Sequence, residues 1–366
     1  MPSVWLVTGY RAGERGQILA LAEALGWPFD IKELSYRKTE FRTSLFRGSN
    51  LRGIRLRDSS PLQPPWPDLV ISSGMRNEPV CRWIRAQSGG RTRIVHIGRP
   101  WAAPERFDLV VTTPQYRLAE HPRVLQNSVT LHRVSAARLA AAARTWEPEF
   151  AELPGPRIAV ILGGNSGPYT LGPRTAAQIA RRVNRMAEQR GGSLLVSSSA
   201  RTPARALRAF EQQISVPCFL YRWRPDDAAN PYFGMLALGD ELVVTADSVA
   251  MLSEACATGK PVQMFDLGGM RTGRREAGDF RLLVDGEEVP VEHFTEVRSG
   301  VFVDTVENVT AASLSSHRAT GFAFRKLSAR ALGAIAAYES DVRSERVTRA
   351  MLQLAIEGRW RGAPAF

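Results

Sequence analysis

The stretch that decides the fold is residues 241–266, ELVVTADSVAMLSEACATGKPVQMFD. Its residues 242–245 form a short β-branched apolar run bounded by charge, which predicts a buried parallel strand. Asp247 and Ser248 follow, and either can cap a helix whose first N–H groups point out of the carboxyl end of that strand. The helix is predicted over 249–258, and a second apolar strand follows it.

Strand, polar cap, helix and strand make a βαβ unit, and such units bind ligands at the carboxyl ends of their strands. Glu254 lies in the body of the predicted helix. One interpretation is that Asp247 and Ser248 only cap the helix and that Glu254 only faces solvent. The other is that these residues belong to a ligand site at the carboxyl ends of the strands, and the neighbouring motifs favour it.

A second predicted strand, residues 157–162, runs directly into a glycine-rich loop. The polar or glycine residues of this loop are Gly163, Gly164, Asn165 and Ser166. Glycines let the backbone approach an anion, and N–H groups at the start of the next helix can bind phosphate. The alternative is a simple turn that needs positive φ. Since this loop and the Asp247 loop both follow parallel strands, we expect them at one edge of a sheet, holding phosphate.

The predicted strand 193–199 ends in a hydroxyl cluster, followed by Arg201 and Thr202. Arg201 is predicted to meet a diphosphate. Ser199 or Thr202 is also expected to cap the helix that follows, because Ser and Thr are favoured at that position.

These residues resemble known proteins. Ser248, Glu254 and the segment 258–262 look like the donor-side element of GT-B glycosyltransferases, in which a polar residue meets the nucleotide's diphosphate and a glutamate holds its ribose. More closely, the chain resembles a bacterial member of the elongated-mitochondria family, the mitochondrial fission proteins of plants. The segments that carry this resemblance are Gly163-Gly164-Asn165, Arg201-Thr202-Pro203, Asn230-Pro231-Tyr232 and residues 244–248.

The resemblance extends from Trp5 to about Phe265. It implies that Asn230 and Tyr232 border the nucleotide base, although packing is the alternative for Tyr232. It also implies an α/β, GT-B-like fold, with two Rossmann-like doubly wound domains facing a cleft and C-terminal helices packing back. The domains are expected at 1–145 (acceptor and membrane side), at 155–315 (nucleotide-sugar donor side) and at 316–366 (helices returning to the first domain).

A strand is predicted at residues 4–8, and the loop that follows it, in the stretch TGYRAGERGQ, departs from relatives of this family. Its glycine spacing is not the GxGxxG fingerprint, so no dinucleotide site is predicted. Where the family usually has a histidine after the glycine, this chain has Glu14. Glu14 is the predicted general base, and a salt bridge from Glu14 to Arg11 or Arg15 is the alternative.

Composition limits the class of protein. Apolar residues make up 44% of 366 residues, as in ordinary globular proteins, and no run approaches the roughly 18 residues of a membrane span. The start of the chain lacks signal-peptide features. Three scattered cysteines without CxxC argue against disulfides and zinc and for the cytoplasm. No DxD-type carboxylate pair appears near the site, so neither a metal nor a cofactor is predicted.

The net charge is +12, and residues 37–57 contain seven basic residues and one acidic residue interleaved with apolar ones. This pattern suits an anionic membrane surface, where each Lys or Arg contributes about 1 kcal/mol. A solvated surface loop is the alternative. The residues expected at the membrane are Arg42, Arg47, Arg52 and Arg55. No nucleic-acid-binding signature is present, so no nucleic-acid partner is expected.

The function predicted from these features is metal-independent transfer of a sugar from a nucleotide-sugar donor to a membrane-associated lipid or glycan acceptor. The protein is expected in the cytoplasm or peripherally on the inner face of the cytoplasmic membrane. Arg271, Arg274 and Arg275 lie in a basic loop whose charge suits a leaving diphosphate. Two alternatives stay open: a non-catalytic adaptor of the mitochondrial fission type, and a nucleotide-sugar epimerase.

Overall fold

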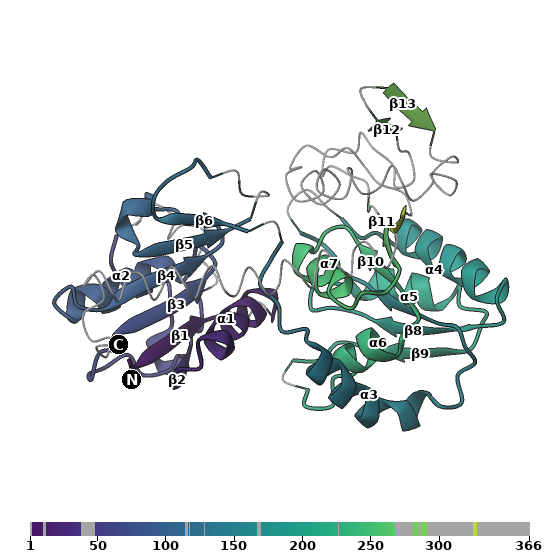
Figure 1. The fold of residues 1–366 in the computed structure, drawn as a ribbon, viewed down its shortest axis with the longest axis horizontal. Coiled ribbons are helices and arrows are strands. Elements are labelled where there is room, and N and C mark those ends of the chain that lie inside the picture. The colour runs from purple at the N-terminus through teal and green to yellow at the C-terminus, as the bar shows by residue number, and fades with distance from the viewer. Residues whose placement is uncertain are drawn as a thin grey trace. The chain divides into compact units, whose positions relative to one another are not determined.

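The computed structural model describes residues 2–9, 12–37, 48–113, 116, 118–127, 129–166, 170–225, 227–265 and 267, and the backbone of strands at 281–284, 287–290 and 325–327. The chain divides into two compact units (Figure 1). The first runs to Arg133 and the second begins at Val134. Each unit consists of a largely parallel sheet with helices on both faces.

The first unit contains a six-stranded sheet in the order β2-β1-β3-β4-β5-β6, in which all neighbours are parallel. Its strands are β1 (Val4–Thr8), β2 (Phe29–Glu33), β3 (Leu69–Ser73), β4 (Arg93–Ile97), β5 (Leu109–Thr112) and β6 (Val124–Gln126). Because side chains alternate along a strand, Leu6 packs with helix α1 (Ala12–Leu25) on one face, and Trp5 packs with α2 (Glu78–Gln87) on the other. Two 3₁₀ turns, η2 (Leu56–Asp58) and η3 (Pro104–Arg106), lie in its loops.

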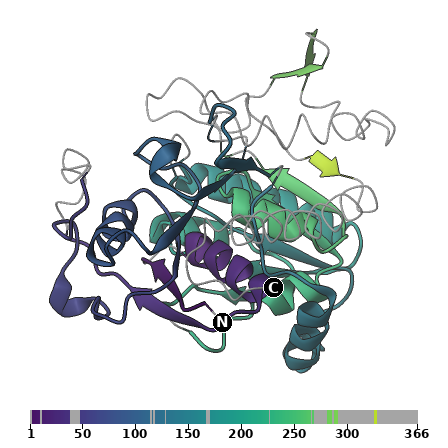
Figure 2. The same ribbon diagram turned by 60° about the vertical axis from the view of Figure 1, so that its left-hand side comes forward.

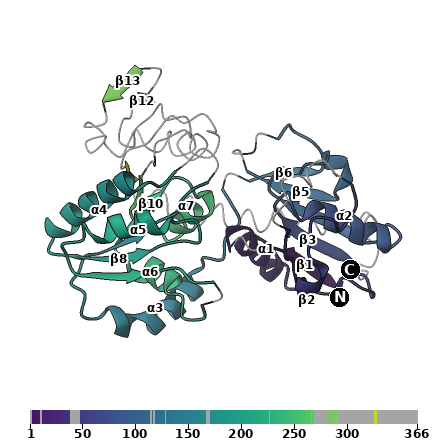
Figure 3. The same ribbon diagram turned by 180° about the vertical axis from the view of Figure 1, so that it is seen from behind.

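The second unit contains a sheet in the order β14-β11-β10-β7-β8-β9, parallel except for β14. Its strands are β7 (Arg157–Ile161), β8 (Ser193–Ser197), β9 (Cys218–Tyr221), β10 (Glu241–Thr245), β11 (Val262–Phe265) and β14 (Arg325–Leu327). Helices α4 (Pro173–Glu188) and α5 (Ala204–Glu211) cover one face. Helices α3 (Ala136–Phe150), α6 (Tyr232–Leu238) and α7 (Val249–Cys256) cover the other, as Figures 1 to 3 show. A separate hairpin joins β12 (Arg281–Val284) to β13 (Glu287–Pro290).

The predicted fold class is confirmed: the chain is α/β, with two Rossmann-like doubly wound sheets, the domain composition of the GT-B fold. Sequence analysis missed β2, whose sequence FDIKE is charged and half-exposed, and α6, a seven-residue helix interrupted by glycine. Helix α1 begins at Ala12, within the stretch TGYRAGERGQ that was expected to be a loop, and Gly13 and Gly16 lie inside the helix. Helix α3 belongs to the second unit, although the first domain was expected to extend to residue 145.

Several predictions lie outside the described residues. They concern the basic loop around Arg271, the membrane-facing Arg42 and Arg47, and the C-terminal helices of 316–366, except that residues 325–327 form strand β14 rather than helix. These stay predictions.

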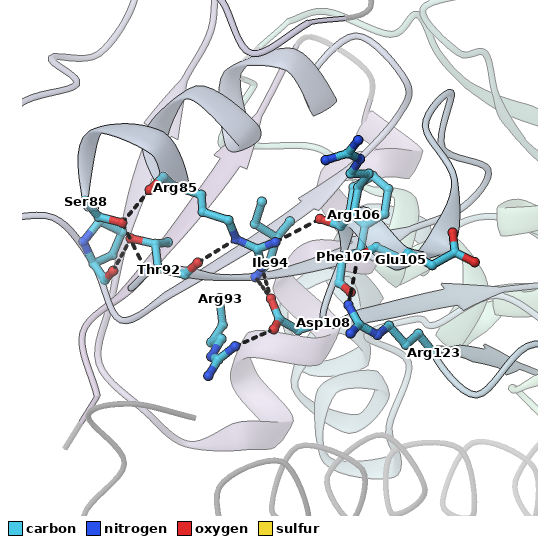
Figure 4. A network of polar contacts seen from close by, with 11 residues as sticks. Arg85, Ser88, Thr92, Arg93, Ile94, Glu105, Arg106, Phe107, Asp108 and Arg123 are labelled. Carbon is cyan, nitrogen blue, oxygen red and sulfur yellow. Dashed lines mark hydrogen bonds and ion pairs between the residues drawn. The ribbon is translucent and has the colours of Figure 1, made fainter. Parts of the chain in front are cut away.

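A polar network ties α2 to the starts of β4 and β5 (Figure 4). Arg85 donates from Nε to the Thr92 carbonyl at 2.9 Å and pairs with Asp108 through Nη2. The Asp108 carboxylate, which is 8% exposed, also accepts from Arg93 Nη1 at 3.0 Å and from the Ile94 N–H at 2.8 Å. Burial lowers the pKa of Arg85 to about 10, so it remains charged at neutral pH. The network is structural, and it holds α2 against the amino-terminal ends of β4 and β5.

We expect Asp108→Ala to lower the free energy of unfolding of the first unit by about 3 kcal/mol, because it removes the buried carboxylate that the Arg85 and Arg93 guanidinium groups and the Ile94 N–H share. Urea denaturation measures this. The control is Asp58→Ala, which removes an ion pair to Arg55 in which both side chains are more than half exposed. That change should cost less than about 1 kcal/mol. Equal losses in the two variants would contradict a structural role for the network.

Candidate functional site

The topology of the second sheet singles out one position at its carboxyl edge. Strand β7 lies between β8 and β10, so the chain moves outward from β7 on one side and later returns to its other side. In open α/β sheets, ligands bind outside the carboxyl ends of the strands at such a switch point. The loop that begins with Gly163 follows β7, and the loop of Asp247 and Ser248 follows β10. Both loops singled out by the sequence therefore lie at the switch point.

Direct hydrogen bonds join these two loops. The Gly164 N–H donates to Asp247 Oδ2 at 2.9 Å, and the Gly163 N–H donates to Thr245 Oγ1 at 2.7 Å. The Thr245 hydroxyl in turn donates to Asp247 Oδ1 at 2.7 Å. The expected convergence of the two loops is confirmed. What the loops bind is not shown by these contacts.

The close approach explains why both positions are glycine. A Cβ atom on Gly163 would lie 2.1 Å from Asp247 Oδ1, and one on Gly164 would lie 2.0 Å from the Arg201 carbonyl oxygen. The N–H groups of both glycines are used inside the protein. Any anion held here would therefore contact Asn165, Arg201 or the start of α7 rather than these two N–H groups.

Asp247 is an anchor rather than a helix cap. Its carboxylate is fully buried and pairs with Arg201 Nη2 at 3.0 Å, whereas the Arg201 side chain is 35% exposed. Burial raises the pKa of Asp247, and Arg201 together with the Thr245 and Gly164 hydrogen bonds opposes that shift. The pair holds a partly exposed guanidinium at the edge of the sheet.

Ser248 caps α7 as predicted, and its Oγ accepts from the Met251 N–H at 3.5 Å. An α-helix leaves its first N–H groups without partners inside the helix, and they favour anions. Those of Val249 and Ala250 therefore lie in the first turn at the switch point.

Glu254 and Tyr232 are brought together from α7 and α6. The Tyr232 hydroxyl donates to Glu254 Oε2 at 2.6 Å, and the Tyr232 N–H donates to Asn230 Oδ1 at 3.0 Å. Burial and the neighbouring carboxylate raise the pKa of Tyr232 well above its usual value, so it remains a donor. Glu254 therefore does not only face solvent, because it accepts a hydrogen bond from Tyr232. Tyr232 packs against the core, which was the alternative prediction for it.

The capping role expected for Ser199 or Thr202 is wrong. Helix α5 begins after Pro203 without a side-chain cap. The Thr202 hydroxyl instead bonds to the Leu162 carbonyl at 3.1 Å and to that of Gly163, and the Ser199 hydroxyl bonds to the Gly163 carbonyl at 3.0 Å. The hydroxyl cluster joins the loop after β8 to the loop after β7.

Asn165 and Ser166 continue the loop after β7. The Asn165 N–H donates to the Arg201 carbonyl at 3.3 Å, and Asn165 Oδ1 accepts from the Leu171 N–H at 3.0 Å. Asn165 is exposed and Ser166 is half-buried. Both are accessible to a ligand at this edge.

In the first unit, Glu14 lies in the first turn of α1. Its carboxylate packs against Gly74 at the end of β3, where a Cβ atom would lie 2.5 Å from Glu14 Oε2. Arg15 pairs with Glu33 rather than with Glu14, and Arg11 lies outside the described residues. Since β1 lies between β2 and β3, Glu14 is at the switch point of its own sheet. Its role as a base stays a prediction.

Two searches of the described ranges gave negative results. None of their helices is long and apolar enough to cross a membrane. None of their groups of three or more His, Cys, Asp or Glu side chains is arranged to hold a metal ion.

We expect Gly164→Ala to lower the free energy of unfolding of the second unit by about 2 kcal/mol or more, because its Cβ must separate two bonded loops. Thermal unfolding measures this. The control is Gly172→Ala in the same unit, where a Cβ would meet nothing within 4 Å. It should cost less than about 1 kcal/mol. If Gly164→Ala lowers the free energy of unfolding no more than Gly172→Ala does, the two loops do not approach each other as closely as described.

Comparison with known proteins gives the family. A family model described as "Mitochondrial fission ELM1" matches residues 12–311. The mitochondrial fission protein ELM1 of Arabidopsis thaliana is 33% identical over 219 residues, which is 54% of this chain and 51% of the plant protein. The match thus spans about half the length of that relative.

Among solved structures, the chain is similar to UDP-GlcNAc 2-epimerase from Neisseria meningitidis bound to UDP-GlcNAc, at 12% identity and a TM-score of 0.46, covering 95% of this chain and 100% of the other. It is also similar to a glycosyltransferase from Rickettsia africae, at 10% identity and a TM-score of 0.42, covering 97% of each chain. The family model covers most of the chain, including the loops bonded at the switch point, and the chain therefore belongs to the mitochondrial fission ELM1 family.

Proposed function

We propose that this chain is a GT-B-type glycosyltransferase that moves a sugar from a nucleotide-sugar donor to a membrane-associated lipid or glycan acceptor. The observation that carries the proposal is the bonding of three loops at the switch point of the second sheet. There Asp247 fixes the partly exposed Arg201 near the start of α7. A cationic fork beside helix N–H groups suits a diphosphate.

The chemistry would proceed through these groups as follows. The bond between the anomeric carbon and the diphosphate oxygen breaks, and its electron pair leaves with the diphosphate. The acceptor oxygen forms the new bond and loses its proton to a base. Arg201 and the first N–H groups of α7 would stabilise the charge that grows on the leaving group. This assignment uses no metal.

Glu254 is the proposed partner of the ribose, because a carboxylate accepts hydrogen bonds from two neighbouring hydroxyls. The Tyr232 hydroxyl bonds to one of its oxygens at 2.6 Å and so restricts its rotation. The loop of Asn230 and Tyr232 is proposed to border the base.

Glu14 is the proposed base. A base must lie within hydrogen-bond reach of the hydroxyl that it deprotonates. Glu14 lies against Gly74, at the carboxyl edge of the first sheet. α/β domains bind their ligands at this edge.

A membrane-bound acceptor is supported by one described feature of the basic segment. Leu56 is 59% exposed and lies between Arg55 and Arg57 in η2. An exposed apolar residue flanked by cations suits the interface of an anionic bilayer.

Nucleotide binding is measured by thermal shift with UDP-, GDP-, ADP- and CMP-sugars. One of them, at 100 times its dissociation constant, should add about 2.7 kcal/mol of stability. Arg201→Gln should weaken that binding at least about tenfold, because it removes a charged contact to the diphosphate. The control is Arg181→Gln, an equal loss of charge at an exposed position on α4.

Three outcomes would count against this assignment. If no nucleotide-sugar shifts the wild-type protein, the adaptor alternative is favoured. If Arg201→Gln and Arg181→Gln weaken nucleotide-sugar binding equally, the effect comes from the lower net charge and not from a contact of Arg201. An unchanged shift in Glu254→Ala would remove the ribose assignment.

Flotation with vesicles containing anionic lipid tests the membrane proposal. Replacing Arg42, Arg47, Arg52 and Arg55 by Gln should release the protein, because each basic residue contributes about 1 kcal/mol at such a surface. The control replaces four exposed arginines of the second unit, Arg174, Arg181, Arg185 and Arg205, by Gln. If the two variants float alike, the basic segment does not direct binding.

A further inference from the structure

The exposed large apolar side chains of the described ranges are unevenly distributed between the two units. They are Ile31 at 36%, Leu56 at 59% and Met75 at 41% exposure, and all three belong to the first unit. Single exposed apolar residues are normal on a folded protein, whereas several of them beside one binding edge indicate a contact surface. The uneven distribution points to the first unit as the one that meets an apolar partner.

Met75 lies at the carboxyl edge of the first sheet. It stands between β3 and α2, in a turn that the Asn77 N–H closes by donating to the Gly74 carbonyl at 3.2 Å. Gly74 has a φ of +84°, and the Glu14 carboxylate packs against it. An exposed methionine is therefore next in sequence to the residue that contacts the proposed base.

Leu56 is held at the same edge, because its segment is hydrogen-bonded to the residues that follow β2. The neighbouring Arg55 donates from its N–H to the Ser35 carbonyl at 2.7 Å and from Nη2 to the Ser35 hydroxyl at 2.8 Å. Ser35 is two residues beyond the end of β2. Leu56 is therefore fixed near the carboxyl end of that strand.

Tyr36 connects the segment of Leu56 to the turn that contains Met75. Its backbone forms an antiparallel bridge with Ile54, and its hydroxyl donates to Asn77 Oδ1 in the turn before α2. A Cβ atom on Gly9, which follows β1, would lie 2.6 Å from the Tyr36 ring. The ring thus crosses the end of β1, the strand between β2 and β3, and joins the two exposed side chains into one edge.

Cations accompany these apolar side chains. The exposed arginines in the same segments are Arg37, Arg52, Arg55 and Arg57. Two of the acidic side chains nearby are paired within the protein, Asp58 with Arg55 and Glu33 with Arg15. The excess of arginine suits an anionic partner.

The opposite edge of the same sheet shows that charge alone does not distinguish the carboxyl edge. Arg91 and Arg106 are exposed there, shortly before β4 and β5 begin. Among the described residues of that edge, no large apolar side chain is exposed. The carboxyl edge combines exposed apolar side chains with arginines, and the amino edge has arginines only.

We propose that the carboxyl edge of the first sheet docks on an anionic lipid bilayer, with the Met75 and Leu56 side chains in the interface. Apolar side chains flanked by cations suit the boundary between head groups and acyl chains, and the arginines suit the anionic head groups. Methionine is flexible and adapts to an irregular apolar surface. An edge docked in this way holds Glu14 beside the head groups, where the hydroxyl of a lipid acceptor lies.

This inference rests on the membrane part of the proposed function. It adds which side of the first unit meets the bilayer and which apolar side chains enter it. It does not depend on nucleotide binding by the second unit.

Flotation of the full chain with vesicles of phosphatidylcholine and phosphatidylglycerol tests it. The decisive variant is Met75→Glu, which we expect to weaken vesicle binding at least about tenfold, because an inserted apolar group is replaced by a charge that the anionic head groups repel. The control is Gln87→Glu, the same change of charge at the exposed far end of α2. It should leave binding nearly unchanged, because salt screens a charge beyond about 10 Å.

Two further measurements separate docking from folding. Met75→Leu should float like wild type, and every Met75 variant should keep its Tm within about 2 °C, because the side chain is exposed. An NBD label on Met75→Cys should be quenched by spin-labelled lipid in the vesicles, whereas the same label on Gln87→Cys should not. The native cysteines are buried or half-buried, and wild-type protein taken through the same labelling is the blank.

The outcomes distinguish this inference from the proposed function. If wild type floats and Met75→Glu floats equally well, another face meets the bilayer, and the membrane-bound acceptor is unaffected. If wild type does not float, both the docking and the membrane-bound acceptor are overturned. Equal weakening by Met75→Glu and Gln87→Glu, or equal quenching of the two labels, also overturns docking through this edge.

Discussion

The buried carboxylate of Asp247 is the constraint on which the second unit's ligand edge depends. It accepts hydrogen bonds from the Gly164 N–H and the Thr245 hydroxyl, and it pairs with Arg201. A buried carboxylate without such partners would be strongly destabilising. The loops after β7, β8 and β10 are therefore held as one piece, and Gly163 must be glycine because a Cβ there would contact the carboxylate.

The two sheets use the same topology to build edges of different polarity. In each, the strand at the switch point is the first of its unit, so the loops that follow it meet loops from much later in the chain. The second unit places a guanidinium and a helix start there. The first unit places the carboxylate of Glu14 there, against Gly74. A guanidinium and helix N–H groups suit a phosphate, whereas a carboxylate suits a hydroxyl.

Local sequence patterns were sufficient for the buried strands of the two sheets, but not for the half-exposed β2 or for the contacts between loops. Runs such as residues 242–245 and 157–162 predict buried strands wherever they occur, since burial on both faces requires apolar residues. The role of Asp247 was not predictable, because its partner Gly164 lies 83 residues away. Sequence analysis located the edges and missed what holds them together.

The Arg201–Asp247 pair sets how strongly an anion can bind at this edge. Asp247 partly neutralises Arg201, so the pair alone offers little net charge, and the start of α7 must supply the remainder. Burial raises the pKa of Asp247, whereas Arg201 and the Thr245 and Gly164 hydrogen bonds stabilise the charged form. An anion at Arg201 would repel the carboxylate and raise its pKa further. The hydrogen bonds that fix the loops thus also limit the affinity of the edge, and a ligand that binds tightly must make contacts beyond its phosphates.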